Sequence, residues 1–442
     1  MTTHQFDSTR LPSERCIVVH PRLLGDEVGS LARDPDASLE EAAGLALAID
    51  LEIGHKEWVK IARPQPATLF GSGTVERLGA VISGLREQGG AVHVVIVDAP
   101  LSPVQQRNLE KAWDCKVIDR TGLILEIFGA RARTREGRLQ VELAALSYQR
   151  SRLVRSWTHL ERQRGGAGFM GGPGERQIEL DRRMIDNRID RIKGELKDVK
   201  RTRTLHRDAR KRVPRPIVAL VGYTNAGKST LFNRMTEAQV VAKDQLFATL
   251  DPTMRAIQLP GGQRAILSDT VGFISNLPHE LVEAFHATLE EVMEADLILH
   301  VRDACHPDTD AQRSDVLAVL SEIGMDVPTQ LAMIEVLNKI DRLPPEERNS
   351  LRQRATRANQ TTVCVSALSG DGLEDLGKVV AARLSQGFEE LDIDLKPDDG
   401  ATLAWLYRNG DVLARDDSGE TIHLRVRLAP AKVGQFNQRH GG

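Results

Sequence analysis

Short apolar runs alternate with amphipathic stretches in the first quarter of the chain. Continuous runs such as 92–100 indicate buried strands, and apolar residues spaced three and four apart indicate helices. By these criteria strands are expected at 16–20, 92–100 and 115–119, and helices at 38–51, 75–89 and 103–113. The first helix has Ser38 at its start and Glu41 three residues later, the sequence of a capping box. The alternation predicts an N-terminal α/β subdomain over residues 16–121, preceded by a polar, flexible tail at 1–15.

Residues 122–213 carry long helical patterns instead. The first pattern runs to about Leu160, and the segment 165–174 then holds seven glycines or prolines in ten positions, too many for a helix. A second pattern, from 175 to 212, would be about 57 Å long at 1.5 Å per residue. Two long helices joined by a glycine-rich loop predict a helical hairpin with a flexible tip, with a charged coiled-coil linker as the alternative.

Strands and helices alternate regularly in residues 214–385, after Pro214 and Pro216 have ended the long helix. Strands are expected at 217–223, 264–272, 296–304, 330–341 and 363–367, and helices at 228–235, 280–292, 310–323 and 373–385. This order predicts a central doubly wound α/β sheet. Residues 386–442 alternate more tightly, with two strands around an Asp-Asp-Ser-Gly turn, and predict a small α+β appendage.

A phosphate-binding loop follows the first strand of the central sheet. The segment 222–229 has the spacing of this motif, and it lies between a strand and a helix as the motif requires. Backbone N–H groups wrap the phosphates, Lys228 neutralises the β and γ oxygens, and the Ser229 hydroxyl binds Mg²⁺. The contacts predicted for this loop are Gly222, Tyr223, Thr224, Asn225, Ala226, Gly227, Lys228, Ser229 and Thr230. The loop alone does not separate an ATPase from a GTPase.

Two later motifs favour guanine over adenine. A carboxylate at Asp341 accepts hydrogen bonds from guanine N1–H and the 2-amino group, which adenine does not offer. Lys339 is expected to lie against the base, and Asn338 to tie its loop to the phosphate loop. The segment 366–368, also at a strand end, is expected to present its backbone to guanine O6. The predicted residues are Asn338, Lys339, Ile340, Asp341, Ser366, Ala367 and Leu368.

Two further segments are expected to respond to the γ-phosphate. Asp269 can hold a water of the magnesium ion, and Gly272 can turn its N–H onto the γ-phosphate. Thr249 completes the metal shell only with GTP, so Ser229 and Thr249 are the predicted metal ligands. The contacts predicted here are Phe247, Ala248, Thr249, Leu250, Asp251, Asp269, Thr270, Val271 and Gly272. Five motifs in the required order, each beside a strand, predict a GTP-binding switch protein that uses Mg²⁺.

Composition defines a protein class and one charged surface. Hydrophobic residues make up 41% of the chain and charged residues 27%, which is typical of globular proteins with full cores. The sequence has no apolar run of membrane-spanning length and no signal sequence, and its four cysteines are scattered, so we expect a cytoplasmic protein without disulfides or zinc. Residues 151–213 hold 18 Lys and Arg against 9 Asp and Glu, although the whole chain has a net charge of −3. The hairpin is therefore a candidate polyanion-binding surface.

The chain resembles the HflX family of ribosome-associated translation-factor GTPases over residues 50–430. The resemblance rests on GYTNAGKST, LFATLD, DTVGF, NKID and SAL, and on RSWTHLERQRGGAGFMGGPGERQIELDRR. It implies a GTPase that binds the large ribosomal subunit, splits or rescues stalled or idle ribosomes, and inserts the hairpin tip into ribosomal RNA near the peptidyl-transferase centre. The tip residues expected to contact RNA are Arg162, Arg164, Phe169, Met170 and Arg176. The family's switch threonine matches Thr249 best, and Thr253 is a second candidate.

One position departs from many GTPases. Phe273 follows Gly272, where a glutamine often orients the attacking water. Since phenylalanine cannot do this, we expect slow hydrolysis that the ribosome stimulates, and no catalytic residue is assigned. Two other functions stay open: a GTP-gated assembly factor for the large subunit, and an RNA-remodelling NTPase acting through the 71–73 turn of the N-terminal subdomain. We expect a monomer.

Overall fold

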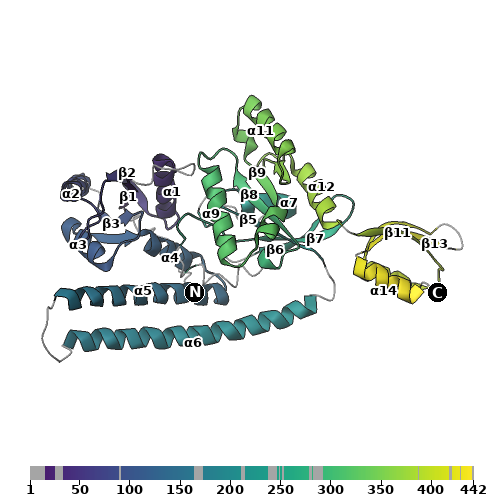
Figure 1. The fold of residues 1–442 in the computed structure, drawn as a ribbon, viewed down its shortest axis with the longest axis horizontal. Coiled ribbons are helices and arrows are strands. Elements are labelled where there is room, and N and C mark those ends of the chain that lie inside the picture. Colours follow the sequence, from purple (N-terminus) through teal and green to yellow (C-terminus); the bar gives the residue numbers. More distant parts are fainter. Residues whose placement is uncertain are drawn as a thin grey trace, which may run out of the picture.

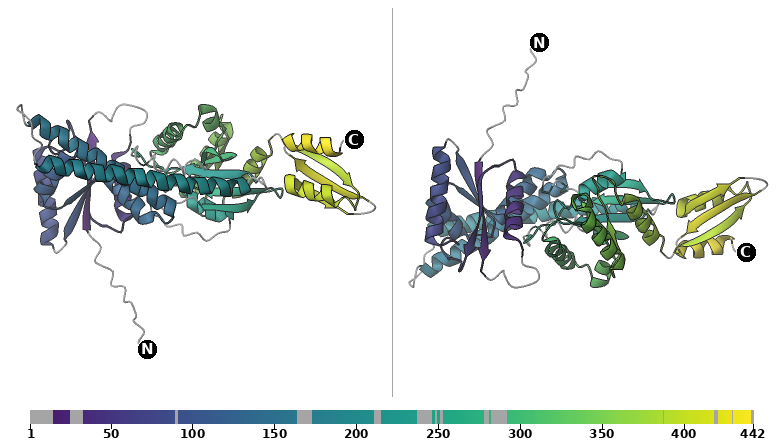
Figure 2. Two further views of the ribbon diagram at one scale, coloured as in Figure 1. Left: turned by 90° about the horizontal axis from the view of Figure 1, so that it is seen from below. Right: turned by 90° about the horizontal axis from the view of Figure 1, so that it is seen from above.

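The structure is a computed structural model in which most of the chain is described. The described residues are 15–24, 33–88, 91–163, 173–210, 215–236, 246–247, 249–250, 253–277, 281, 292–386, 388–417, 421–428 and 430–440. The molecule is elongated, with one α/β region at the N-terminal end, a second α/β sheet in the middle and a small α+β unit at the other end (Figure 1). Two long helices lie side by side along the first two regions (Figures 1 and 2).

The N-terminal sheet has four parallel strands in the order β2-β1-β3-β4. The strands are β1 (Arg15–Leu23), β2 (Glu52–Ile61), β3 (Val92–Val97) and β4 (Lys116–Asp119). The helices are α1 (Pro35–Leu47), α2 (Ser72–Glu87), α3 (Pro103–Trp113) and α4 (Arg120–Arg131). One hydrophobic core contains Phe70 and Trp113, and a second contains Leu45 and Phe128 and continues into the central region. This shared core joins the N-terminal region to the middle of the molecule.

Two expectations about this region need correction. Helix α1 begins at Pro35, and Asp34 is its N-cap, accepting a hydrogen bond from Asp36 N at 2.9 Å. Ser38 therefore lies inside the helix, because a proline at the first helical position costs no N–H and extends the helix toward Asp34. The strand β2 was not expected, because most of its side chains are polar and only partly buried.

The helical hairpin consists of α5 (Arg135–Gln163) and α6 (Pro173–Arg210). The two helices are antiparallel and are joined by an ion pair between Arg188 and Glu142 at 2.7 Å. The expected helix from 122 is interrupted, because Ala132 is extended and Thr134 Oγ1 accepts the N–H of Gly137 at 2.9 Å and so begins α5. Of the glycine-rich segment 165–174, residues 165–172 lie outside the described residues. Pro173 and Gly174 were expected to be non-helical but begin α6, because a proline is tolerated at the first helical position.

The central sheet has six strands in the order β10-β9-β8-β5-β7-β6, and β6 alone among them is antiparallel to its neighbour. The strands are β5 (Ile217–Gly222), β6 (Thr253–Gln258), β7 (Arg264–Asp269), β8 (Leu297–Asp303), β9 (Ile334–Asn338) and β10 (Thr362–Cys364). The helices are α7 (Lys228–Thr236), α9 (Thr309–Glu322), α10 (Val327–Ala332), α11 (Pro345–Arg357) and α12 (Leu373–Leu384). This is the doubly wound α/β sheet predicted from the sequence.

Some elements of the central region differ from expectation. The strand expected from 330 begins only at Ile334, because Asp326 caps a short helix, α10, that includes Gln330. The antiparallel strand β6 and the helix α11 were not expected. Most of the helix expected at 280–292 lies outside the described residues.

The C-terminal unit is a small α+β structure, as expected. Its antiparallel sheet has the order β11-β13-β12. The strands are β11 (Glu389–Leu395), β12 (Asp411–Asp416) and β13 (Ile422–Leu428), and the helices are α13 (Gly400–Asn409) and α14 (Pro430–His440). Within the described part of the whole chain, no helix is both long and apolar enough to cross a membrane. Cys16, Cys115, Cys305 and Cys364 carry free thiols.

Candidate nucleotide site

The predicted nucleotide-binding residues gather at one edge of the central sheet, where β5, β7 and β9 end. A cavity of about 260 Å³ lies there. Of the predicted residues it is lined by Thr224, Asn225, Gly227, Lys228, Ser229, Thr230, Phe247, Thr249, Thr270, Gly272, Asn338, Lys339, Asp341, Ala367 and Leu368. Arg342 also lines the cavity and was missed, although it directly follows the NKID motif. Ala248 and Asp251 lie outside the described residues.

The other predicted residues do not line the cavity but belong to the same motifs. They are Gly222, Tyr223, Ala226, Leu250, Asp269, Val271, Ile340 and Ser366. Most of them are nearly inaccessible to solvent; Ser366, for example, is 0% exposed. The Ser366 hydroxyl accepts the N–H of Ser369 at 3.1 Å, so this serine shapes the turn that places Ala367 and Leu368 at the cavity.

The phosphate loop has the open backbone that its motif requires. Gly227 has φ +92°, and a Cβ at this position would lie 2.2 Å from Asn338 Nδ2. No other residue type fits there without moving Asn338. The Lys228 ammonium is buried and donates to the carbonyl oxygens of Gly222 at 2.9 Å and Tyr223 at 2.8 Å. Burial lowers the pKa of Lys228 to about 8, although the nearby Asp269 opposes the shift.

Three side-chain oxygens lie together beside the loop and form a candidate metal centre. Asp269 Oδ2 accepts hydrogen bonds from Ser229 Oγ at 2.7 Å and from Thr249 Oγ1 at 2.9 Å. The other carboxylate oxygen, Asp269 Oδ1, is buried without a hydrogen-bond partner. Burial raises the pKa of Asp269, against the hydrogen bonds from Ser229 and Thr249 and the charge of Lys228. Hydroxyl and carboxylate oxygens are the ligands that Mg²⁺ prefers, and a cation here would stabilise the buried charge, so the residues fit this ion.

Asn338 joins three of the predicted loops. Its amide Nδ2 donates to the Ala226 carbonyl at 2.9 Å, and its Oδ1 accepts the N–H of Ala367 at 3.0 Å. Lys339, in the left-handed region at φ +64°, forms an ion pair with Asp303 at 2.8 Å. Asp303 was not singled out from the sequence, although it ends a buried strand, which is where such residues are found. The loops predicted to select guanine and the phosphate loop are thus held in one arrangement.

Phe273 does not lie over the cavity. Its side chain is 1% exposed and belongs to the core shared with the N-terminal region. Its backbone pairs with the phosphate loop: Thr224 N donates to Phe273 O at 2.7 Å, and Phe273 N donates to Gly222 O at 3.1 Å. This side chain therefore offers no hydrogen bond to a water beside a bound phosphate.

The structure leaves the candidate RNA contacts open. Arg162 and Arg176 lie in α5 and α6, where their side chains are outside the described part of the chain. Arg164, Phe169 and Met170 fall in the undescribed segment between the two helices.

Four family profiles match successive parts of this chain. They are described as GTP-binding GTPase N-terminal (36–129), GTP-binding GTPase Middle Region (131–210), 50S ribosome-binding GTPase (217–339) and HflX C-terminal domain (350–442). Together they cover most of the chain, from α1 to the last helix.

Relatives match over most of their length. GTPase HflX of Magnetococcus marinus is 50% identical over 398 residues, which cover 90% of this chain and 89% of the relative. GTPase HflX of Escherichia coli is 46% identical over 346 residues, 78% of each chain. Putative GTP-binding protein 6 of Xenopus laevis is 36% identical over 434 residues, 96% of this chain and 80% of the relative.

Among solved structures, the GTP-binding protein of the archaeon Sulfolobus solfataricus in complex with GDP is 21% identical. It covers 84% of this chain and 99% of that chain, with a TM-score of 0.44. Era of Aquifex aeolicus bound to GDP and AlF4⁻ is 22% identical, covers 42% of this chain and 74% of that chain, and has a TM-score of 0.29.

Proposed function

The chain belongs to the HflX family of GTPases, and from this premise we propose that it splits or rescues ribosomes by binding the large subunit in its GTP state. It is a GTPase with a P-loop domain. The proposal is supported by the profile described as a 50S ribosome-binding GTPase, which matches the domain that carries the nucleotide cavity. Action on ribosomes would take place in the cytoplasm, and we propose that the protein acts as a monomer.

We assign the nucleotide contacts to the residues that the cavity gathers. Lys228 neutralises the β and γ oxygens, and its lowered pKa returns toward normal beside the phosphate charge. Asp341 accepts the two guanine donors, since its side chain is exposed at the cavity, and Asn338 keeps its loop in place. Ser229 and Thr249 would be the direct ligands of Mg²⁺, and Asp269, hydrogen-bonded to both, would hold one of its waters. Bound Mg²⁺ supplies positive charge to the β and γ oxygens.

The hairpin α5–α6 is the proposed ribosomal contact. Residues 151–213, which include the C-terminal part of α5 and all of α6, hold 18 Lys and Arg against 9 Asp and Glu, although the whole chain has a net charge of −3. The two helices extend along the N-terminal and central regions. Lys and Arg bind RNA phosphates. A glycine-rich loop has few side chains, so its backbone can approach RNA closely. GTP binding would order the segments around Thr249 and Gly272 and so select the form of the protein that holds the hairpin on RNA.

We expect hydrolysis to be slow in the isolated protein and faster on the ribosome. The reason is that Phe273, buried in the shared core, cannot orient the attacking water, so the partner must supply or order that group. In a single-turnover experiment, large subunits should raise the rate of phosphate release by about 100-fold or more, the scale of general-base catalysis. Small subunits alone serve as the control. Equal rates with and without large subunits would contradict this prediction.

A further inference from the structure

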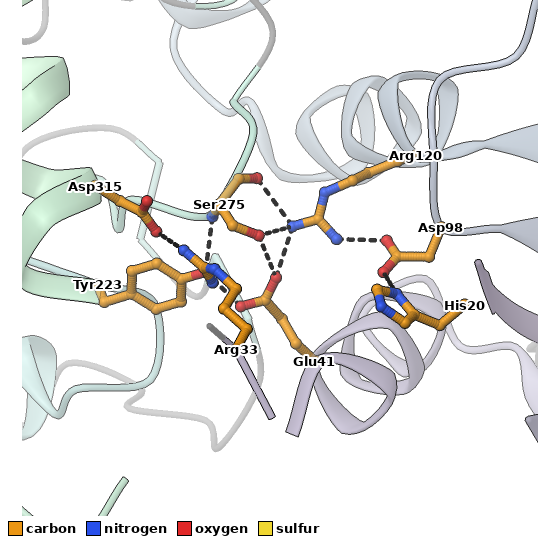
Figure 3. Close-up of polar contacts among 8 residues, drawn as sticks. All are labelled: His20, Arg33, Glu41, Asp98, Arg120, Tyr223, Ser275 and Asp315. Atoms are coloured by element: carbon orange, nitrogen blue, oxygen red, sulfur yellow. Dashed lines mark hydrogen bonds and ion pairs between the residues drawn. The ribbon is translucent and has the colours of Figure 1, made fainter. Parts of the chain in front are cut away.

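A buried polar network joins the N-terminal region to the nucleotide site (Figure 3). Its eight residues are His20, Arg33, Glu41, Asp98, Arg120, Tyr223, Ser275 and Asp315. Two of them belong to segments that border the nucleotide cavity: Tyr223 lies in the phosphate loop, and Ser275 follows Gly272 by three residues. We call residues 272–275 the switch segment.

Arg120 is the centre of the network. Its side chain is 5% exposed and lies between two carboxylates: it donates to Asp98 Oδ1, and to Glu41 Oε1 at 2.6 Å. The same guanidinium donates to the carbonyl oxygen of Ser275 at 2.9 Å and to its hydroxyl oxygen at 2.7 Å. One arginine of the N-terminal region thus contacts both backbone and side chain of the switch segment.

Glu41 and Tyr223 complete the link to the phosphate loop. The Tyr223 hydroxyl donates to Glu41 Oε2 and accepts the backbone N–H of Ser275 at 2.7 Å. The Ser275 hydroxyl donates to Glu41 Oε1 at 3.0 Å. Ser275 is therefore held on both sides, by Arg120 at its oxygens and by Tyr223 at its N–H. Such charge-assisted hydrogen bonds are strong away from water.

In this arrangement the switch segment lies closed on the phosphate loop. A Cβ on Gly272 would lie 2.8 Å from the Thr224 side chain and 3.1 Å from Lys228 Nζ. Phe273 is also hydrogen-bonded to the backbone of the loop. A phosphoryl group between Gly272 N–H and the lysine needs about 2.8 Å on each side for its hydrogen bonds. Because these contacts leave little space between the switch segment and Lys228, we infer that a γ-phosphate is admitted only when the segment moves away. The β-phosphate, by contrast, is cradled by the backbone N–H groups of the phosphate loop itself.

We propose that Arg120 is a positioning residue of the GTPase, which holds the switch segment closed through Ser275 and so lowers the affinity for GTP relative to GDP. When Gly272 moves outward to admit the γ-phosphate, Ser275 is pulled from Arg120 and Tyr223, and buried charge-assisted bonds are lost. Because coupling between sites is reciprocal, GTP binding loosens the contact of the N-terminal region with the central region. The proposal concerns nucleotide preference alone and does not depend on ribosome binding.

The test compares the affinities of the full-length protein for fluorescent GDP and for a fluorescent non-hydrolysable GTP analogue. Arg120→Gln should raise the analogue-to-GDP affinity ratio at least about fivefold, the lower end of coupling between sites in one protein. Arg120→Lys, which keeps the charge and one donor, should restore part of the parental ratio. The matched control is Arg86→Gln: Arg86 donates only to backbone oxygens of the N-terminal region, at 2.8 to 3.4 Å, and its loss should leave the ratio unchanged.

A double-mutant cycle tests whether Arg120 acts through Ser275. Ser275→Ala removes the hydroxyl contacts but keeps the carbonyl, so the ratio should rise by less than in Arg120→Gln. Combined with Arg120→Gln it should add less than its effect alone, since both changes remove the contact between the guanidinium and the Ser275 hydroxyl. An unchanged ratio in folded Arg120→Gln, or additive effects in the double variant, would overturn the proposal. If Arg120→Gln does not fold, the test is the analogue-to-GDP affinity ratio of the Ser275→Ala protein. A raised ratio supports the proposal, and an unchanged ratio overturns it.

Discussion

Asp341→Asn is expected to lower the affinity for GTP by about 100-fold or more and to make xanthine nucleotides the preferred ligands. The Asp341 carboxylate lines the cavity and only accepts hydrogen bonds, so in the proposed site it would face the N1–H and 2-amino donors of guanine. In Asp341→Asn, the amide NH₂ group points toward one of the two guanine donors. That guanine donor then has no acceptor, and an unpaired donor in a site of this kind lowers the affinity strongly. Xanthine has a carbonyl oxygen in place of the 2-amino group, and this oxygen accepts from the new amide.

The measurement is a titration of the protein with fluorescent GDP and xanthosine diphosphate. Asp398→Asn, on an exposed loop of the C-terminal unit, makes the same chemical change away from the cavity and should bind both nucleotides like the parent. An Asp341→Asn protein that still binds GDP with parental affinity would show that guanine is recognised elsewhere.

The second large effect is expected at the hairpin tip. Replacing Arg162, Arg164 and Arg176 by glutamine should weaken binding to large subunits about tenfold or more at low salt, because three phosphate contacts are lost. The plot of log affinity against log salt should become flatter by about 2 to 3 units, since each neutralised phosphate contributes a little less than one unit. Sedimentation of labelled protein with large subunits at several salt concentrations measures both quantities.

The control for this variant removes the same charge from another surface. Arg352, Arg354 and Arg357 lie in α11, and their replacement by glutamine also lowers the net charge by three. That protein should keep the parental affinity and slope. If the tip variant also keeps both, the hairpin is not the RNA contact.

Most of the residues that line the cavity could be predicted from the sequence because their motifs are local. Each predicted guanine or phosphate contact lies in a short motif next to a strand, and parallel strands bring their ends to one edge of the sheet. Partners that depend on tertiary packing were not predictable in this way. Asp303, which pairs with Lys339 at 2.8 Å, comes from a different strand, and Arg120 meets Ser275 from 155 positions away in the chain.

Elements were missed where their signals are weak. The strand β2 has polar, half-exposed side chains, so its hydrophobic alternation is faint. The break between α4 and α5 rests on the extended Ala132 and the capping hydroxyl of Thr134, two common residues that mark a helix end only in context. The shared hydrophobic core, which buries Phe273, gave no signal along the chain because its members come from separate regions.

The central claim is that the GTP form separates ribosomal subunits, which an assembly factor for the large subunit would not do. Light scattering of intact ribosomes, mixed with excess protein and a non-hydrolysable GTP analogue, tests it directly. We predict that the scattering falls with the analogue, and that it stays constant with GDP and with the Arg162, Arg164 and Arg176 variant. Constant scattering with the analogue, while the protein is bound to the ribosomes, would contradict the account.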